Sequence, residues 1–176
     1  LRRAELRSRL SALMHDAVIP APFDQFRTVV RPEWIDYNGH MNVAYYVLAF
    51  DHGTDAFWTY LGIGEDYLRR TNGSTFALET HVTYQGEVKL GDRLRIASQL
   101  VDFDAKRIHF FQRMYHASQG YLAATMECVS LHVSLETRRG APFPQDRLDW
   151  LARVKAAHDA LGPPAEIGRS VGLRSG

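Results

Sequence analysis

The hydrophobic pattern of the first third of the chain predicts two helices around one strand. Leucine, methionine and alanine recur at helical spacing among arginines in residues 1–18, which indicates a short amphipathic helix or arm ended by two prolines. A strand is expected from Phe23 to about Arg31. After a polar stretch comes a long apolar run without proline, Val43–Leu61, which is typical of a helix buried over much of its circumference.

The second half of the chain alternates in a way that predicts an antiparallel sheet. Gly and Asp separate β-rich runs at intervals typical of hairpins. The runs expected to form strands are 75–84, 93–102, 107–116 and 121–135, and a helix is expected over 146–161. We therefore divide the chain into an N-terminal arm (1–22), a central domain (23–145), and a C-terminal helix with a loose tail (146–176).

A single apolar helix needs a surface to cover it, and a strongly curved sheet supplies one. The sequence therefore predicts an α+β fold in which the long helix lies in the concave face of the sheet. Such a sheet has free edge strands, so we expect dimerisation edge to edge.

Composition narrows the functional classes. The 176 residues are 45% hydrophobic and 23% charged, which fits a globular protein, and the net charge of +1 argues against a nucleic-acid partner held by bulk charge. No apolar run approaches the roughly 18 residues of a membrane span, so no membrane partner is expected. Cys128 is the only cysteine, which favours a reducing, cytoplasmic setting. Because the sequence begins with Leu1, we expect a chain that was trimmed or cut from something longer.

The stretch just before the long helix carries the densest chemistry. Asp36, Asn38 and His40 place a carboxylate, an amide and an imidazole at alternate positions, and the helix start at Asn42 and Val43 offers free backbone N–H groups. Those donors and the helix dipole can polarise a carbonyl oxygen, so the set suits acyl transfer. The same residue types are also common in turns and helix caps, so a purely structural loop is the alternative.

This stretch, Trp34 to Tyr46, resembles the signature of hotdog-fold thioesterases. Asp36, Asn38 and His40 match the D-x-N-x-H constellation of plant acyl-ACP thioesterases. In the 4-hydroxybenzoyl-CoA thioesterase group, the catalytic Asp falls on Asp36 and a Tyr of the first helical turn falls on Tyr46. The resemblance implies a dimeric hotdog fold, hydrolysis of a small-molecule acyl-CoA substrate, and no cofactor. It also implies that Tyr46 contacts the substrate, and the free N–H groups near Asn42 and Val43 are expected to bind the thioester oxygen.

The resemblance extends to substrate recognition. Lys106 and Arg107 resemble the basic hairpin segment that holds the phosphates of CoA in that group. Within the family, the sequence most resembles the thioesterases of carnitine breakdown, some of which are fused behind a dehydrogenase. Betainyl-CoA is therefore the candidate substrate. In the expected strand 75–84, Glu79 and His81 alternate onto one face with Ala77, so Glu79 is a candidate contact for a cationic acyl group; an exposed cross-strand pair is the alternative.

Several choices stay open at this level. Asp36 can act as nucleophile or as general base, and Asp51 and Asp55 of the long helix compete with it as the catalytic acid, because another branch of the family carries its carboxylate there. Rival functions are a hydratase or dehydratase on the same fold and a non-catalytic acyl-CoA-binding domain of a fusion protein. The assembly can be a homodimer or a tetramer.

Overall fold

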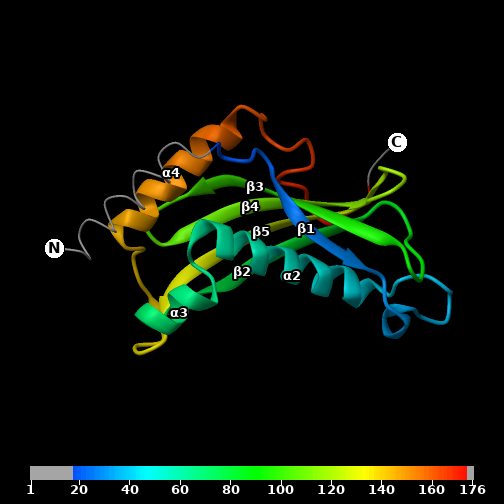
Figure 1. Ribbon diagram of the computed structural model, residues 1–176, viewed down its shortest axis with the longest axis horizontal. Coiled ribbons are helices and arrows are strands. Elements are labelled where there is room, and N and C mark those ends of the chain that lie inside the picture. The colour runs from blue at the N-terminus through cyan, green and yellow to red at the C-terminus, as the bar shows by residue number, and fades with distance from the viewer. Residues whose placement is uncertain (1–17, 174–176) are drawn as a thin grey trace.

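The computed structural model describes residues 18–173, and nearly all of the expected N-terminal helix lies outside them. One antiparallel sheet curves around the long helix α2 (Figure 1). Its strands are β1 (Phe23–Val29), β2 (Gly73–Tyr84), β3 (Arg93–Phe103), β4 (Arg107–His116), β5 (Leu122–Ser134) and β6 (Arg139–Gly140), in the spatial order β1-β3-β4-β5-β2 with β6 beside β5. The helices are α2 (Val43–Leu61), α3 (Glu65–Thr71) and α4 (Gln145–Asp159), and a 3-10 turn spans Pro32–Trp34.

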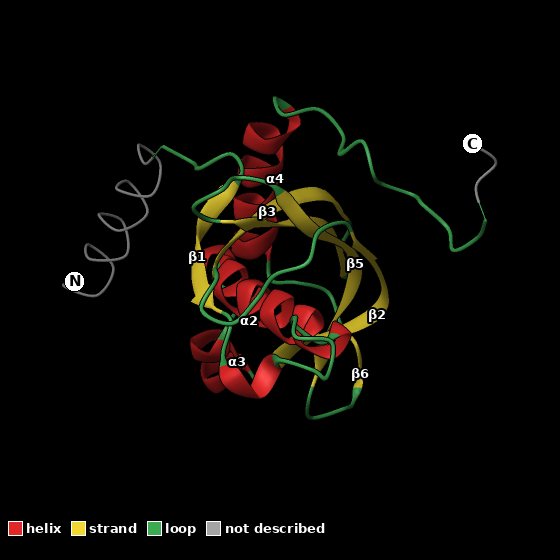
Figure 2. Cartoon of the chain, turned by 90° about the vertical axis from the view of Figure 1, so that its right-hand side faces the viewer, coloured by secondary structure: helices red, strands yellow, loops and turns green. Residues whose placement is uncertain are grey.

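Helix α2 forms because both of its ends are capped and its interior lacks proline. The side chain of Asn42 accepts a hydrogen bond from the Ala44 N–H, and Gly62 ends the helix with a φ of 72°. The buried face of α2 packs into the concave side of the sheet (Figure 2). A Cβ placed on Gly53 would lie 2.9 Å from Cγ2 of Ile96, so this glycine lets helix and sheet approach closely. The predicted helix and sheet are thus confirmed.

Helix α3 was not expected from the sequence. It has only seven residues, too few to show a hydrophobic period, and it ends at Asn72, whose φ of 57° is left-handed. Its one buried side chain is Tyr67, whose hydroxyl lies 2.9 Å from Nε2 of His132 on β5. Tertiary packing therefore fixes this short helix.

Helix α4 covers the sheet beside β3 and is anchored by one histidine. His158 is fully buried. Its Nδ1 accepts a hydrogen bond from the Leu100 N–H at 2.8 Å, and its Nε2 donates to the Pro20 carbonyl at 2.9 Å. Burial lowers the pKa of this imidazole, which keeps it neutral. His158 thereby joins α4, β3 and the segment before β1.

The segment after α4 is fastened to the convex face of the sheet. Glu166 pairs with Arg113 of β4 at 2.8 Å, and the Gly168 N–H donates to Glu127 of β5 at 2.8 Å. Glu127 also lies 2.8 Å from Nε2 of His109. In residues 18–173, no helix is both long enough and apolar enough to span a membrane.

Strand β2 ends the sheet on one side and carries a bulge. Ala77 pairs with Ser130 but Glu79 pairs with Val129, so Leu78 is an extra residue without a counterpart on β5. The bulge reverses the alternation beyond it, and the next residue on the cavity side is Thr80. The expectation that Glu79 and His81 share a face with Ala77 is therefore wrong, because it assumed unbroken alternation.

Candidate active site

The polar loop predicted to carry the chemistry is a tight turn that leads into α2. An antiparallel bridge between Ile35 and Met41 closes it. Inside the bridge, the Asp36 N–H donates to the His40 carbonyl at 3.1 Å, and the Gly39 N–H donates to the Asp36 carbonyl at 3.0 Å. Gly39 has a φ of 81°, a conformation that favours glycine. The backbone thus places Asp36, Asn38 and His40 in one turn, and of these three residues only His40 lines the cavity at the start of α2.

Asp36 both fastens the loop and keeps one oxygen free. Its Oδ1 accepts a hydrogen bond from the Asn38 N–H at 2.8 Å, as in an Asx turn. Its Oδ2 has no hydrogen-bond partner among the residues that the structure describes. The side chain of Asn38 is exposed and likewise makes no hydrogen bond within that range. The carboxylate is therefore held by one oxygen while the other can meet a substrate or a water.

His40 lines a cavity at the start of α2. The cavity measures about 280 Å³, and Tyr46, Tyr84 and Gly86 are also among its lining residues. Nδ1 of His40 lies 3.2 Å from the Met41 carbonyl. Because a carbonyl only accepts, Nδ1 carries the hydrogen and Nε2 of the neutral ring is the basic nitrogen.

The first turn of α2 supplies an unpaired donor next to this cavity. Of the two N–H groups predicted to be free, that of Asn42 is not, because it donates to the Trp34 carbonyl at 2.8 Å. Val43 lines the cavity, and its N–H has no acceptor among residues 18–173, whereas the next N–H, that of Ala44, is capped by Asn42. Tyr46 is buried, its hydroxyl donates to the Gly86 carbonyl at 3.2 Å, and burial raises its pKa. Tyr46 therefore ties α2 to the loop after β2, while Val43 offers the dipole end of a helix to an oxygen.

The predicted basic residues lie far from this loop within one chain. Arg107 pairs with Leu131 across the sheet, and Leu131 pairs with Phe76 near the beginning of β2. The Asp36–His40 loop contacts the opposite end, beyond Tyr84, roughly 30 Å away along the strand. Lys106 and Arg107 are exposed, and Arg107 forms an ion pair with Asp104.

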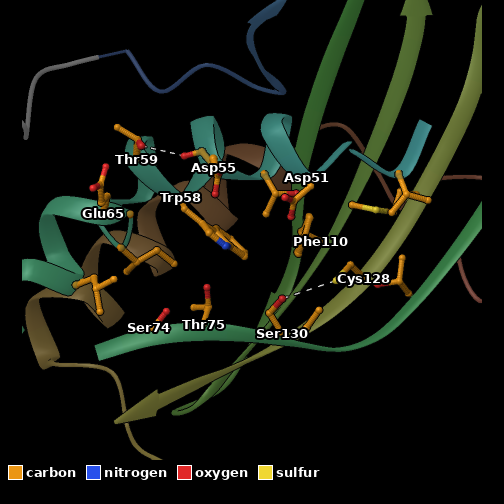
Figure 3. Close-up of a pocket in the computed structure, with 18 residues that line it drawn as sticks. Asp51, Asp55, Trp58, Thr59, Glu65, Ser74, Thr75, Phe110, Cys128 and Ser130 are labelled. Atoms are coloured by element: carbon orange, nitrogen blue, oxygen red, sulfur yellow. Dashed lines mark hydrogen bonds between the residues drawn. The ribbon is translucent and has the colours of Figure 1, made fainter. Parts of the chain in front are cut away.

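A second, larger cavity lies between the other part of α2 and strands β2 and β5 (Figure 3). It measures about 620 Å³. Asp51, Asp55 and Trp58 line it from α2, and Thr75 and Thr80 line it from β2. The sequence singled out Asp51 and Asp55 only as competing acids. Their spacing with Trp58, at i, i+4 and i+7, places all three on one helix face and could have indicated a shared site.

A long helix in the concave face of a curved antiparallel sheet, with a polar loop at the start of the helix, is the hotdog architecture that the resemblance implied. The model of the thioesterase-like superfamily matches residues 30–151, and the chain belongs to this superfamily. The predicted fold and family are therefore confirmed.

The relatives agree with this membership. A betainyl-CoA thioesterase of Pseudomonas aeruginosa is 38% identical over 148 residues, which are 84% of this chain and 93% of that protein. An L-carnitine dehydrogenase/betainyl-CoA thioesterase of Ruegeria pomeroyi is 35% identical, and the match covers 96% of this chain but only 34% of that protein. Among solved structures, protein SAV2348 of Staphylococcus aureus, determined in complex with CoA, is similar with a TM-score of 0.81 and 28% identity, over 90% of this chain and 99% of that one.

Proposed function

We propose that the protein hydrolyses acyl-CoA thioesters to a free acid and CoA, with betainyl-CoA as the substrate. The observation that carries the proposal is the loop before α2, in which the free Oδ2 of Asp36 precedes the unpaired N–H of Val43. Membership of the thioesterase-like superfamily and the relatives that act on betainyl-CoA support it.

The proposed reaction needs water and side chains but no cofactor. The thioester oxygen accepts a hydrogen bond from Val43 N–H, where the helix dipole stabilises the developing negative charge. Asp36 either attacks the carbonyl carbon or takes a proton from the attacking water. The C–S bond then breaks, and the thiolate of CoA takes up the proton that the water loses. Where Asp36 attacks directly, the acyl group is left on Asp36 as a mixed anhydride, and water then hydrolyses this anhydride to the free acid and the Asp36 carboxylate. Asn38 orients the attacking group, and His40 holds the loop or serves as the base.

We further propose that the protein acts as a homodimer joined through β2. This strand ends the sheet, and its residues 76–80 are all exposed, among them Phe76 at 41% and Leu78 at 57%. A twofold axis across β2 would place the Gly73 end of one strand beside the Tyr84 end of the other. The Lys106–Arg107 turn of one copy would then approach the Asp36 loop of the other, where it could bind the phosphates of CoA.

Replacement of Asp36 tests the proposed activity. In Asp36→Asn, the amide oxygen can still accept from the Asn38 N–H, so the thermal unfolding midpoint should stay close to that of the wild type. Thiol release from betainyl-CoA should fall by roughly 10²-fold or more, because general-base or nucleophilic chemistry is lost. CoA binding, measured by calorimetry, should persist.

The same assay separates the alternatives. Unchanged turnover in Asp36→Asn, with turnover abolished in Asp51→Asn or Asp55→Asn, would move the catalytic acid to α2. Tight CoA binding without thiol release across short, aromatic, long-chain and betainyl thioesters would contradict hydrolysis and favour an acyl-CoA-binding domain. Gain or loss of enoyl absorbance without thiol release would favour a hydratase.

A further inference from the structure

The larger cavity carries an uncompensated negative charge. Three carboxylates line it, those of Asp51, Asp55 and Glu65, and no Lys, Arg or His is among its lining residues. Glu65 is paired with Arg69 at 2.9 Å, but the carboxylates of Asp51 and Asp55 have no ion pair or hydrogen bond within residues 18–173. Burial, and after it the charge of Asp51, raise the pKa of Asp55, while nearby His52 opposes the shift. A positive ligand would relieve this repulsion.

Trp58 lines the same cavity with an aromatic ring whose N–H donor is not used by the protein. Its side chain is only 7% exposed, and its ring packs edge-on against Phe110 with centroids 4.9 Å apart. The indole Nε1–H has no acceptor in the described part of the chain, and Figure 3 shows the ring projecting from α2 into the cavity. This N–H is open to the cavity, where it can donate to water or to an oxygen of a bound molecule. The ring face also attracts quaternary ammonium groups.

We propose that this cavity binds the positively charged end of the acyl group, a quaternary ammonium, between the carboxylates of Asp51 and Asp55 and the ring of Trp58. The inference rests on the proposed thioesterase function and adds the residues that select the substrate. Asp51 and Asp55 are then specificity residues and not the catalytic acid. Glu79 takes no part, because the bulge turns it away from this cavity.

Distances along α2 show which copy supplies the thioester site. Asp51 lies about 12 Å and Asp55 about 18 Å beyond Val43 along the helix axis. In a betainyl group, a single methylene separates the carbonyl carbon from the nitrogen. A thioester held at Val43 cannot therefore present its cation to these carboxylates in the same chain.

If a second copy pairs through β2, the thioester site of one copy and the cation site of the other come close together. Ser74 and Thr75, which line the large cavity, would lie beside the Tyr84 end of the second strand, and Tyr84 contacts Tyr46 at the start of α2. The carbonyl site of one copy then faces the cation site of the other. The specificity of each site accordingly depends on the dimer.

The test compares betainyl-CoA with 3,3-dimethylbutyryl-CoA, a neutral thioester of the same shape in which carbon replaces the ammonium nitrogen. The wild type should favour the cationic substrate in kcat/KM. Asp55→Asn and Asp51→Asn should each lower kcat/KM for betainyl-CoA about tenfold, since one nearby opposite charge is lost. Neither should change kcat/KM for the neutral thioester appreciably. Asp149→Asn, which removes a carboxylate on α4 away from the cavity, is the matched control and should change neither value.

Two substitutions of Trp58, one that keeps an aromatic ring and one that removes it, test whether the ring contributes to cation binding. Trp58→Phe keeps a ring face and should retain the preference for the cation, whereas Trp58→Leu should weaken it. If the aspartate variants lower kcat/KM equally for both thioesters, or if the wild type does not discriminate between them, the cation site is refuted while the thioesterase function stands. If the wild type hydrolyses neither thioester, the proposed function itself fails, and the inference with it.

Discussion

Replacing His158 by phenylalanine should destabilise the protein strongly at neutral pH. Phenylalanine keeps the ring that stacks on Phe57, with centroids 6.3 Å apart, but it can neither accept from the Leu100 N–H nor donate to the Pro20 carbonyl. Each of the two buried groups left unpaired costs about 1–3 kcal/mol, so the free energy of unfolding should fall by about 2–6 kcal/mol. For a chain of this size, the midpoint of thermal unfolding should drop by about 5–15 °C.

The same substitution should change how stability depends on pH. Burial lowers the pKa of His158, so the folded protein keeps this imidazole neutral at pH values where the unfolded chain, with a pKa of about 6.5, already binds a proton. The stabilisation is fully present above that value and is lost as the pH falls toward the lowered pKa. The difference between wild type and His158→Phe should therefore shrink below pH 6.5, by up to about 1.4 kcal/mol per pH unit.

Urea unfolding of both proteins between pH 8 and pH 5 measures this difference. Other titrating groups act in both proteins and largely cancel in the comparison. Equal stability at pH 8 would show that the two hydrogen bonds do not anchor α4. A difference that stays constant down to pH 5 would show that His158 is not held neutral by the fold.

Two further substitutions and one titration test the contacts that hold α2 and the turn before β4 in place. Gly53→Ala should lower the free energy of unfolding by about 1–2 kcal/mol, since the new Cβ would crowd Ile96 by more than the gain in helix propensity offsets, and unchanged stability in urea would contradict the close approach. Asn42→Ala should cost about 1 kcal/mol by removing the cap of α2, while Asn42→Ser should cost much less; equal losses in thermal unfolding would show that the cap does not matter. Backbone N–H donors of Lys106 and Arg107 and the Arg107 guanidinium lower the pKa of Asp104, so its carboxyl should titrate by NMR below the ordinary value of about 3.9, and a midpoint at or above that value would refute the turn geometry.

The sequence predicted the features that depend on local pattern. The apolar run of α2 and the turn around Gly39 are set by neighbouring residues, so the helix and the polar loop were found where the structure has them. The cap that the Asn42 side chain provides was not predicted. The loop also carried the family resemblance, which supplied the hotdog fold.

The features that were missed depend on partners distant in the sequence. The bulge at Leu78 arises from the register of β2 against β5. The residue types within β2 do not indicate this register. The large cavity is assembled from α2, β2 and β5, which are distant in the sequence. The sequence therefore could not show that Asp51 and Asp55 line a cavity together with Trp58 and the strands. The roughly 30 Å between Arg107 and the Asp36 loop likewise follows from strand order and not from spacing in the chain.

The bulge at Leu78 marks a place where the length of β2 can change without changing the wall of the large cavity. Deleting that residue would leave Ala77 opposite Ser130, Glu79 opposite Val129 and Thr80 opposite Cys128, so regular alternation would still turn Glu79 away from the cavity and keep Thr80 facing it. Related chains that are one residue shorter at this point are then expected to keep the same lining residues and the same charge in this cavity.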